Sequence, residues 1–396
     1  MENETSRRGF LAATATATTA ALPLSASAAT HAPNVYARLG IRPVINGVGV
    51  VTHLLGSLMH PEVLRAMEDA ARHFIPLTEL QAKAGARIAE LLGAEAAMIT
   101  NGCASAITMG TVACIAQGDP EKLKRLPDTA GMKHEVILQK THRSGYEQQM
   151  LLVGAKTVWV ETKDELERAF NERTAMLFYF NDRDADGQIN RRDWLAAAKR
   201  HNVPAFLDAA SDASPRERLF QYQKEGFDLV AFSGGKAIRG PQSSGILLGR
   251  KDLIAAALPG FNPFASIGRG MKVGKEEMVG LLTALERYLK ADHEGELREL
   301  ESRVTDIRSG LAGITGLATE RHVPPIANHV PHVLVHWNEK AFPFKTADVT
   351  RKLMEGDTPI AVSGLGEHGL KISVWMMQPG EHKAVLRRLR EIFQAV

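Results

Sequence analysis

Short apolar runs alternate with helix-length amphipathic stretches from about residue 60 to about residue 250, and this alternation constrains the fold more than any other feature. The runs are rich in β-branched and aromatic residues and are apolar on both faces, which is typical of strands buried on both sides. Parallel strands need a crossover, usually a helix, between one strand and the next. The pattern predicts an α/β fold in which helices cover both faces of a mostly parallel, seven-stranded sheet.

The expected strands cover residues 97–100, 135–139, 157–160, 175–180, 204–208, 228–233 and 245–249, and expected helices include 61–72, 79–92 and 191–201. Further strands at 331–337 and 370–375 and a helix at 381–393 predict a small C-terminal α/β domain. We therefore expect an N-terminal segment at 29–60, a large domain at 61–274, a linking helix at 275–291 and the small domain at 292–396.

The first residues differ in kind from the rest of the chain. Arg7 and Arg8 precede a charge-free run rich in Ala and Thr, which ends near the small residues at 26–28. These are the parts of a secretory signal, and the arginine pair followed by Phe-Leu resembles the twin-arginine type, which exports folded proteins. We expect residues 1–28 to be such a signal, which would send the protein to the periplasm and leave no membrane span after cleavage. A tail with a chance arginine pair is the alternative.

The net charge and the cysteines limit the kinds of partner and of crosslink that the chain can have. The formal net charge of +3 is spread without a basic block, so no nucleic-acid or membrane-surface footprint is visible and a small-molecule partner is expected. Cys103 and Cys114 fall in one expected helix, ~16 Å apart at ~1.5 Å per residue, which is beyond disulfide reach. No zinc-ligand spacing occurs, and no metal site is expected.

Residues that could bind a cofactor or take part in a reaction lie at the ends of three expected strands. The turn at 100–105, TNGCAS, follows a strand and opens a helix, so that its free N–H groups can approach a phosphate; a simple tight turn is the alternative. Asp208 ends a buried strand and needs a cation or donors, unless it only caps the next helix. Lys236 follows a third strand and is flanked by glycines, Gly234 and Gly235 before it and Gly240 after it. A partly desolvated lysine at such a place can become a Schiff-base residue. A solvated loop lysine is the alternative.

In this order, these residues resemble the fold-type-I pyridoxal-phosphate (PLP) enzymes, whose fold is that of aspartate aminotransferase. PVING at 43–47, GSLM at 56–59, SGGK at 233–236 and GPQ at 240–242 are similar to the branch of bacterial selenocysteine synthase and D-glucosaminate-6-phosphate ammonia-lyase. The likeness runs from about residue 38 to the C-terminus.

The resemblance implies PLP as cofactor and a role for each matching residue. Lys236 would hold PLP as a Schiff base and later act as acid and base, and Asp208 would bind the pyridine nitrogen. His142 would stack on one face of the ring and Ala210 would face the other. The implied phosphate contacts are Gly102, Cys103, Ala104 and Ser233. A homodimer or a higher homo-oligomer is also implied.

The substrate-anchoring residue departs from the wider pattern. Many relatives that handle amino acids bind the substrate carboxylate with an arginine in the small domain, whereas the comparable strand at 370–375 reads LKISVW. Arg239 and Arg269 are the candidates for substrate binding, and surface ion pairs are the alternative for each.

Two other motifs point elsewhere. Residues 182–193 have the spacing of a calcium-binding EF-hand loop, but they follow an expected strand, and Asp193 stands where that loop has a glutamate, so an acidic turn is preferred. SGGK also matches the Ser-x-x-Lys motif of exported serine hydrolases, but the accompanying SDN and KTG triplets are absent from the sequence.

The expected reaction follows from the ammonia-lyase-like motifs. Lys236 would remove the Cα proton of a small amino acid or an amino sugar acid, and elimination would follow. Transferase, aldolase, aminotransferase and racemase chemistry stay open, because the protein chooses the bond to break through a torsion that the sequence does not show. A PLP-fold binding protein without catalysis is a further alternative. A tRNA substrate is not expected, because the chain lacks a basic patch and starts with an export signal.

Overall fold

The computed structural model describes residues 35–394. The expected export signal at 1–28 therefore lies outside the described residues. The chain divides into two compact units, 1–43 and 44–396. The described part of the first unit holds one 3-10 helix, Val35–Leu39. No helix among residues 35–394 combines the length and the apolar character that crossing a membrane requires.

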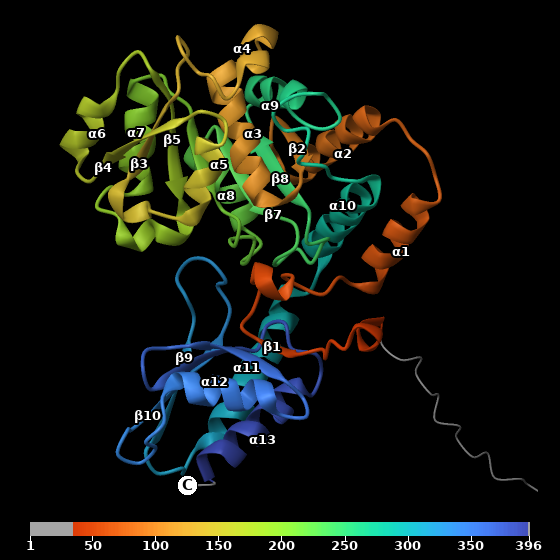
Figure 1. Cartoon of the computed structure of the whole chain (residues 1–396), viewed down its shortest axis with the longest axis vertical. Helices are drawn as coiled ribbons and strands as arrows, with labels where there is room; N and C mark the ends of the chain where they lie inside the picture. Colours follow the sequence, from red (N-terminus) through yellow and green to blue (C-terminus); the bar gives the residue numbers. More distant parts are fainter. Residues whose placement is uncertain (1–34, 395–396) are drawn as a thin grey trace, which may run out of the picture. The chain divides into compact units, whose positions relative to one another are not determined.

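A seven-stranded sheet forms the large domain (Figure 1). Its strands are β2 (Ala96–Thr100), β3 (Glu135–Gln139), β4 (Lys156–Val160), β5 (Thr174–Phe180), β6 (Ala205–Asp208), β7 (Leu229–Ser233) and β8 (Gly245–Gly249). They lie in the order β2-β8-β7-β6-β5-β3-β4. β8 is antiparallel to both of its neighbours, and the pairs among β3 to β7 are parallel. The expected α/β fold with a mostly parallel seven-stranded sheet is confirmed.

Helices surround this sheet. They are α1 (Pro61–Ala71), α2 (Leu77–Leu92), α3 (Gly102–Ala116), α4 (Pro120–Arg125), α5 (Gln148–Leu151), α6 (Lys163–Ala169), α7 (Arg191–Arg200), α8 (Arg218–Glu225), α9 (Lys251–Ala257) and α10 (Lys275–Lys290). Nearly every residue of α3 is buried, because α3 packs against the sheet and against α5 and α9. α10 packs against α1 and α2, and its buried residues belong to the core of the large domain. Cys103 and Cys114 are both free and buried in α3.

A second, five-stranded sheet has its own hydrophobic core. Its order is β1 (Ile45–Gly47), β11 (Ile360–Gly364), β12 (Gly369–Ser373), β10 (His332–Trp337) and β9 (Leu317–His322). The helices α11 (His293–Leu311), α12 (Thr346–Glu355) and α13 (Glu381–Gln394) accompany it. β1 pairs in parallel with β11, so residues from the expected N-terminal segment complete the C-terminal sheet. Three residues reading Ile-Asn-Gly carry too little periodicity to predict that strand.

Candidate active site

Lys236 lies in the turn that follows β7, at the carboxyl end of the parallel strands. Its Nζ donates a hydrogen bond to Oγ of Ser211 across 2.6 Å. The turn is closed by two backbone hydrogen bonds, from Gly234 N to Ser244 O at 2.9 Å and from Gly240 N to Gly234 O at 2.8 Å. A short closed turn therefore holds the lysine in front of the loop that follows β6.

The segment at 56–59 packs against this turn. Ser57 Oγ donates to Gly235 O across 3.1 Å. Gly56 has a φ of +71°, and a Cβ built on it would lie 2.2 Å from both Gly235 O and Gln242 Oε1. Only glycine fits here, because the backbone conformation and the close approach both exclude a side chain. The GSLM, SGGK and GPQ motifs, which are far apart in the sequence, therefore form one structural unit.

Asp208 ends β6, next to β7 in the sheet. Its Oδ1 accepts hydrogen bonds from Ala210 N at 2.9 Å and from the Cys103 thiol at 3.3 Å. Burial raises the pKa of this carboxyl to about 6, although the positive charge of Lys236 opposes the rise. Within the described residues no ion pair forms with it. A buried acid at a strand end, held by one backbone N–H and one thiol, has room for a cationic partner.

The first turn of α3 is open at its end. Gly102 has a φ of +72°, and a Cβ built on it would meet no atom within 4 Å. Behind it, a Cβ on Gly245 would lie 2.5 Å from the carbonyl carbon of Gly102, so glycine is needed for β8 to approach α3. Ala104 and Ser233 are half-buried, whereas the Cys103 side chain turns to Asp208. The structure therefore leaves Cys103 only its backbone N–H for the expected phosphate contact.

His142, which is expected to stack on the cofactor ring, lies in a closed environment. It ends a 3-10 helix after β3 and is completely buried. Gln139 Nε2 donates to its Nε2 across 3.2 Å, and its ring packs edge-on against Tyr179 at 4.5 Å between centroids. Burial lowers the pKa of His142 to about 4. A ring with no exposed face cannot stack on a cofactor in this arrangement, so the geometry gives the stacking role no support. Ala210, by contrast, is half-buried beside Asp208.

The two candidate arginines lie in different surroundings. Arg239 Nε donates to Leu58 O across 2.8 Å, and its side chain lines a cavity of about 810 Å³ together with His60 and Arg287. Burial lowers the pKa of Arg239. Arg269 is exposed in the loop before α10, where it contacts Asn262 Oδ1 at 3.5 Å. The guanidinium groups of Arg239 and Arg269 contact different residues, and no described contact joins them.

Three polar residues near Lys236 were not predicted. Ser211 accepts its hydrogen bond, and Asp182 and Asp212 lie close enough to interact electrostatically with one another. Burial raises the pKa of Asp182, with Asp212 adding to the rise and Lys236 opposing it. Ser211 and Asp212 lie in the cluster DAASD at 208–212, of which the sequence analysis used only Asp208 and Ala210, and Asp182 was considered only as part of the acidic stretch at 182–193.

The acidic stretch at 182–193 directs its carboxylates to protein partners. Asp184 accepts from the Tyr179 hydroxyl at 2.7 Å and pairs with Arg191 at 3.0 Å. Asp193 pairs with Lys163 at 2.6 Å. Within residues 35–394 no group of His, Cys, Asp and Glu side chains is arranged to hold a metal ion. Asn190 caps α7 by accepting from Asp193 N, which is the local backbone bonding expected of an acidic turn.

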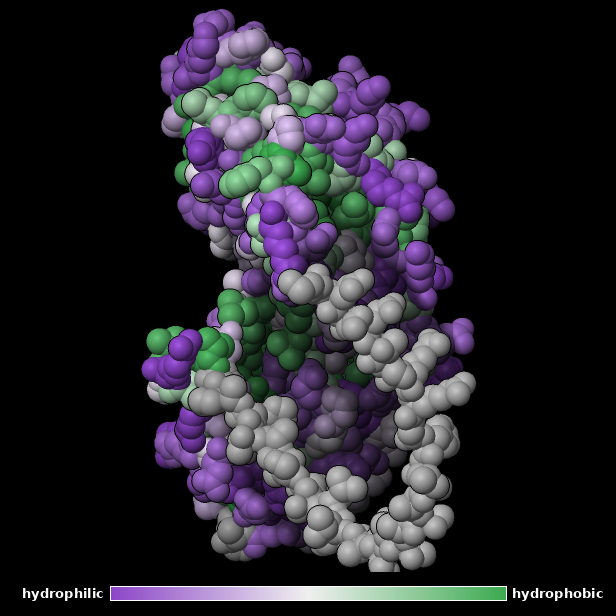
Figure 2. All heavy atoms as spheres, turned by 90° about the vertical axis from the view of Figure 1, so that its right-hand side faces the viewer, coloured by the Kyte–Doolittle hydropathy of each residue, from purple (hydrophilic) through white to green (hydrophobic). Residues whose placement is uncertain are grey.

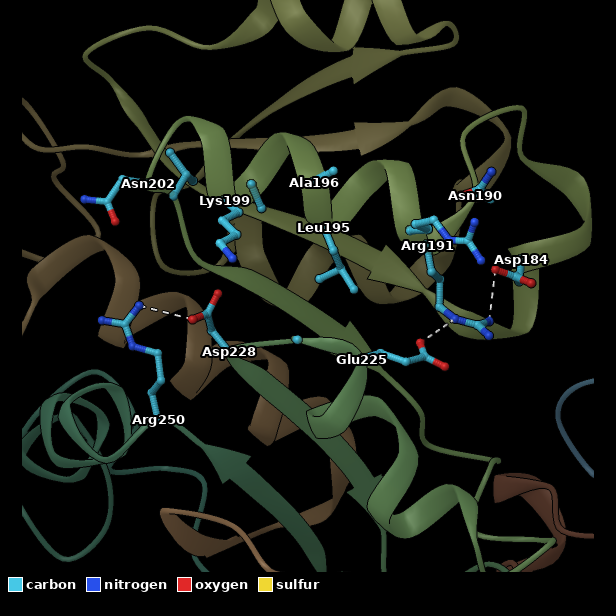
Figure 3. Close-up of a pocket in the computed structure, with 14 residues that line it drawn as sticks. Asp184, Asn190, Arg191, Leu195, Ala196, Lys199, Asn202, Glu225, Asp228 and Arg250 are labelled. Atoms are coloured by element: carbon cyan, nitrogen blue, oxygen red, sulfur yellow. Dashed lines mark hydrogen bonds and ion pairs between the residues drawn. The ribbon is translucent and has the colours of Figure 1, made fainter.

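A cavity of about 1050 Å³ runs along α7 (Figure 3). It is lined by α7, by the end of α8 and by residues that precede β6 and β7, such as Val203 and Asp228. Its labelled charges form two separate groups: Arg191 pairs with Asp184 and Glu225, and Arg250 pairs with Asp228 (Figure 3). Neither Lys236 nor Asp208 nor Ser211 lines this cavity, so it is not the candidate active site.

The residues at the carboxyl edge fit PLP. The buried Asp208 carboxyl suits the pyridine nitrogen, Lys236 suits the aldehyde, and the open end of α3 suits the phosphate. The Ser-x-x-Lys hydrolase is excluded on geometry, because Ser233 ends a strand, whereas that motif requires a helix that starts at the serine.

Comparisons with known proteins agree with this geometry. Residues 153–308 match the family model "SelA: L-seryl-tRNA selenium transferase". The chain is 31% identical over 376 residues to D-glucosaminate-6-phosphate ammonia lyase of Salmonella typhimurium, which covers 91% of this chain and 98% of that protein. It is 30% identical over 374 residues to the 5'-C-glycyluridine monooxygenase-decarboxylase of a Streptomyces species, covering 90% of this chain and 91% of that protein.

A solved structure of D-glucosaminate-6-phosphate ammonia-lyase superposes with a TM-score of 0.80 at 30% identity, covering 92% of this chain and 99% of that one. Serine palmitoyltransferase with PLP superposes with a TM-score of 0.58 at 15% identity, which shows the shared fold. The chain thus belongs to the SelA-like family of fold-type-I PLP-dependent enzymes, together with D-glucosaminate-6-phosphate ammonia-lyase.

Proposed function

We propose that this enzyme is a PLP-dependent lyase in which Lys236 removes the Cα proton of a small amino acid or an amino sugar acid and elimination follows. The observation that carries the proposal is the placement of the Lys236 amine and the buried Asp208 carboxyl at the carboxyl ends of adjacent strands. The lyase relative, which matches over 91% of the chain, supports this choice of reaction.

Each proposed contact uses a group that the fold already positions. PLP, when bound, supplies an electron sink for the electrons released at Cα. Asp208 holds a proton on the pyridine nitrogen, because a cationic partner offsets the burial of its carboxylate. The first N–H groups of α3, with Gly102, Cys103 and Ala104, bind the phosphate together with the Ser233 hydroxyl. Ala210 leaves room for the ring.

Lys236 carries the proton transfer. With PLP bound, Nζ would be the group that accepts the proton from Cα, and the short closed turn keeps it in reach. Arg239 is the proposed partner of the substrate's anionic group, because its half-buried side chain lines a cavity beside the lysine turn. Exposed Arg269 is the second candidate.

The substrate class rests on the relatives. The ammonia lyase is named for an amino sugar acid phosphate, and a relative with nearly the same identity is named as a monooxygenase-decarboxylase of 5'-C-glycyluridine. Both names describe substrates with an amino group on a polyhydroxylated molecule. We propose an amino sugar acid first and a small amino acid second.

The experiment follows the cofactor and the products together. Purified protein is mixed with PLP and should show the visible absorbance of a lysine-bound cofactor, which Lys236→Ala abolishes and the exposed-lysine control Lys251→Ala retains. With D-glucosaminate 6-phosphate and a panel of amino acids, ammonia and a 2-oxo acid should appear. Carbon dioxide would indicate a decarboxylase, an aldehyde an aldolase, and interconverted enantiomers a racemase. Absence of the band would overturn the proposal, and a band without turnover would indicate a binding protein.

We also propose that the enzyme is a homodimer. Leu55, Leu64, Phe74 and Ile75 are exposed hydrophobic residues on or near α1. Figure 2 views the molecule from the side of Figure 1 on which α1 lies and shows hydrophobic surface there between hydrophilic regions. Large apolar side chains at the surface favour a protein partner. Light scattering should give twice the chain mass, and Phe74→Asp should shift it towards the monomer; a monomeric wild-type protein would contradict the proposal.

Export is proposed from the sequence of the first residues. Arg7 and Arg8 with the apolar run that follows support a twin-arginine signal that directs the protein to the periplasm. Cell fractionation should find the processed protein in the periplasm. Replacing both arginines by lysine should leave it unprocessed in the cytoplasm, and processing that does not depend on the pair would contradict this route.

A further inference from the structure

The hydrogen bond from Lys236 to Ser211 is one of several that converge on a single turn. Ser211 lies three residues after Asp208, and its hydroxyl accepts from Lys236 Nζ at 2.6 Å. The backbone oxygen of the same residue accepts from Asn328 N at 3.0 Å. Ser211 thus connects the reactive lysine to the loop between β9 and β10, which belongs to the second sheet.

The loop between β9 and β10 makes further contacts with the same region. Ala327 N donates to Asp212 Oδ1 across 2.8 Å, and Arg218 donates to Pro325 O across 2.6 Å. Two consecutive N–H groups of the loop therefore point at the consecutive residues Ser211 and Asp212. Such pairing fixes the position of both partners more closely than one hydrogen bond would.

The loop adopts an unfavourable backbone conformation to make these contacts. Ala327 has a φ of +52° and Asn328 a φ of +51°, so two successive residues other than glycine are left-handed. For alanine this conformation is sterically unfavourable. Strained backbone persists where the surroundings determine it, and such positions cluster at functional sites. Here the conformation turns both N–H groups towards the turn at 211–212.

Asp212 is held from two other sides. It is almost completely buried; its Oδ2 accepts from Asn181 Nδ2 at 2.7 Å, and its Oδ1 lies 3.5 Å from Arg218. The turn at 211–212 is therefore tied to the end of β5, to α8 and to the β9–β10 loop. The Ser211 hydroxyl is consequently presented to Lys236 from a fixed backbone.

We propose that Ser211 is a positioning residue for Lys236, and that the β9–β10 loop sets its place. This inference rests on the proposed function, because it concerns the amine when it is not joined to the cofactor. In that state Oγ of Ser211 accepts a hydrogen bond from Nζ and keeps the Nζ lone pair in reach of the substrate. The C–H bond at Cα breaks, its proton goes to Nζ, and its electron pair stays on the substrate.

The first test removes and restores the hydroxyl. Apoenzyme of wild type, Ser211→Ala, Ser211→Thr and the exposed-serine control Ser243→Ala is mixed with PLP, and the appearance of the visible band is timed. Loss of the one hydrogen bond that orients the neutral amine predicts about 5-fold slower attachment in Ser211→Ala. Ser211→Thr should recover most of the rate and Ser243→Ala should match wild type. With Cα-deuterated substrate, the isotope effect on kcat should rise in Ser211→Ala alone.

The second test separates the loop from the hydroxyl. Ala327→Gly keeps the N–H and accepts the left-handed conformation, so attachment should proceed as in wild type. Ala327→Pro removes the N–H and cannot adopt a φ of +52°, so it should slow attachment as Ser211→Ala does. Circular dichroism confirms that each variant is folded; if Ala327→Pro is not, Ser211→Ala decides.

The outcomes distinguish the two proposals. A wild-type protein that forms no band with PLP contradicts the proposed function itself. A wild-type protein that forms the band, together with a Ser211→Ala variant that attaches PLP equally fast and shows an unchanged isotope effect, overturns only the role of Ser211. Wild-type rates in Ala327→Pro, with slow attachment in Ser211→Ala, would overturn the role of the loop.

Discussion

The thiol of Cys103 donates a hydrogen bond to Oδ1 of Asp208 across 3.3 Å, from the first turn of α3 to the end of β6. Burial raises the pKa of this thiol well above its usual value, and the nearby Asp208 adds to the rise. The sulfur therefore keeps its proton and stays a donor. The thiol favours the ionised form of a carboxyl that burial would otherwise keep protonated, and it helps to leave Asp208 able to bind a cation.

Replacing Cys103 should weaken cofactor binding in a pH-dependent way. Cys103→Ala removes the donor, so the pKa of Asp208 rises further and PLP affinity near pH 7 should fall several-fold, on the order of 1 kcal/mol for one hydrogen bond. Cys103→Ser restores a donor and should recover the affinity. Titration of apoenzyme with PLP at several pH values measures the effect.

Cys114 provides the matched control, because it is also buried in α3 and makes no contact with Asp208. Cys114→Ala should lower stability and leave PLP affinity unchanged. Equal affinity losses in the two alanine variants would mean that helix packing, and not the thiol donor, is responsible.

Asp208 should also make the apoenzyme less stable as pH rises. Its pKa is about 6 in the fold and 3.8 ordinarily, so between these values the unfolded chain has lost a proton that the folded chain keeps. Unfolding then becomes easier with rising pH, by about 3 kcal/mol in all, and the loss is complete above pH 6. Asp208→Asn has no such charge. In urea denaturation of apoenzyme, the stability of the variant relative to wild type should increase between pH 4 and pH 6.5. A constant difference across this range would contradict the raised pKa.

Much of the large domain could be predicted because its signals are local. Runs such as 135–139 and 245–249 are apolar on both faces, and the structure gives them the same bounds as strands. Alternation of strands and helices then leaves few arrangements, and strand ends meet at one edge. Asp208 and Lys236 were found as candidates for that reason.

The features that sequence reasoning missed depend on distant segments. β1 is a strand only because β11 pairs with it. Ser211 is notable only because Lys236 turns towards it and Asn328 holds it from the second sheet. The burial of His142 depends on the positions of Gln139 and Tyr179, which resemblance to a family does not fix.

His142 should make the protein sensitive to acid. Its pKa is about 4 in the folded chain and 6.5 in the unfolded chain. As pH falls through this range, His142 becomes protonated in the unfolded chain but stays neutral in the folded chain. Stability present above pH 6.5 is lost progressively towards pH 4, by about 3 kcal/mol at most. His142→Phe cannot be protonated, and its stability relative to wild type should improve between pH 7 and pH 5. The exposed His73→Gln should follow wild type, and a His142→Phe profile parallel to wild type would refute the assignment.

Gly56 should be intolerant of any side chain, because it combines a positive φ with a close approach to the turn that holds Lys236. Its φ is +71°, and an added Cβ would lie 2.2 Å from the backbone oxygen of Gly235, beside Lys236. Gly366 has a similar φ of +63° but open space around it, so Gly366→Ala isolates the conformational cost of about 1 kcal/mol. Gly56→Ala must also displace the lysine turn. We expect it to lose at least about 2 kcal/mol of stability and most of its PLP binding, measured by urea denaturation and by the visible band, whereas Gly366→Ala should bind PLP as wild type does. Equal stability losses with intact PLP binding in both variants would show that the 56–59 segment does not support the lysine turn.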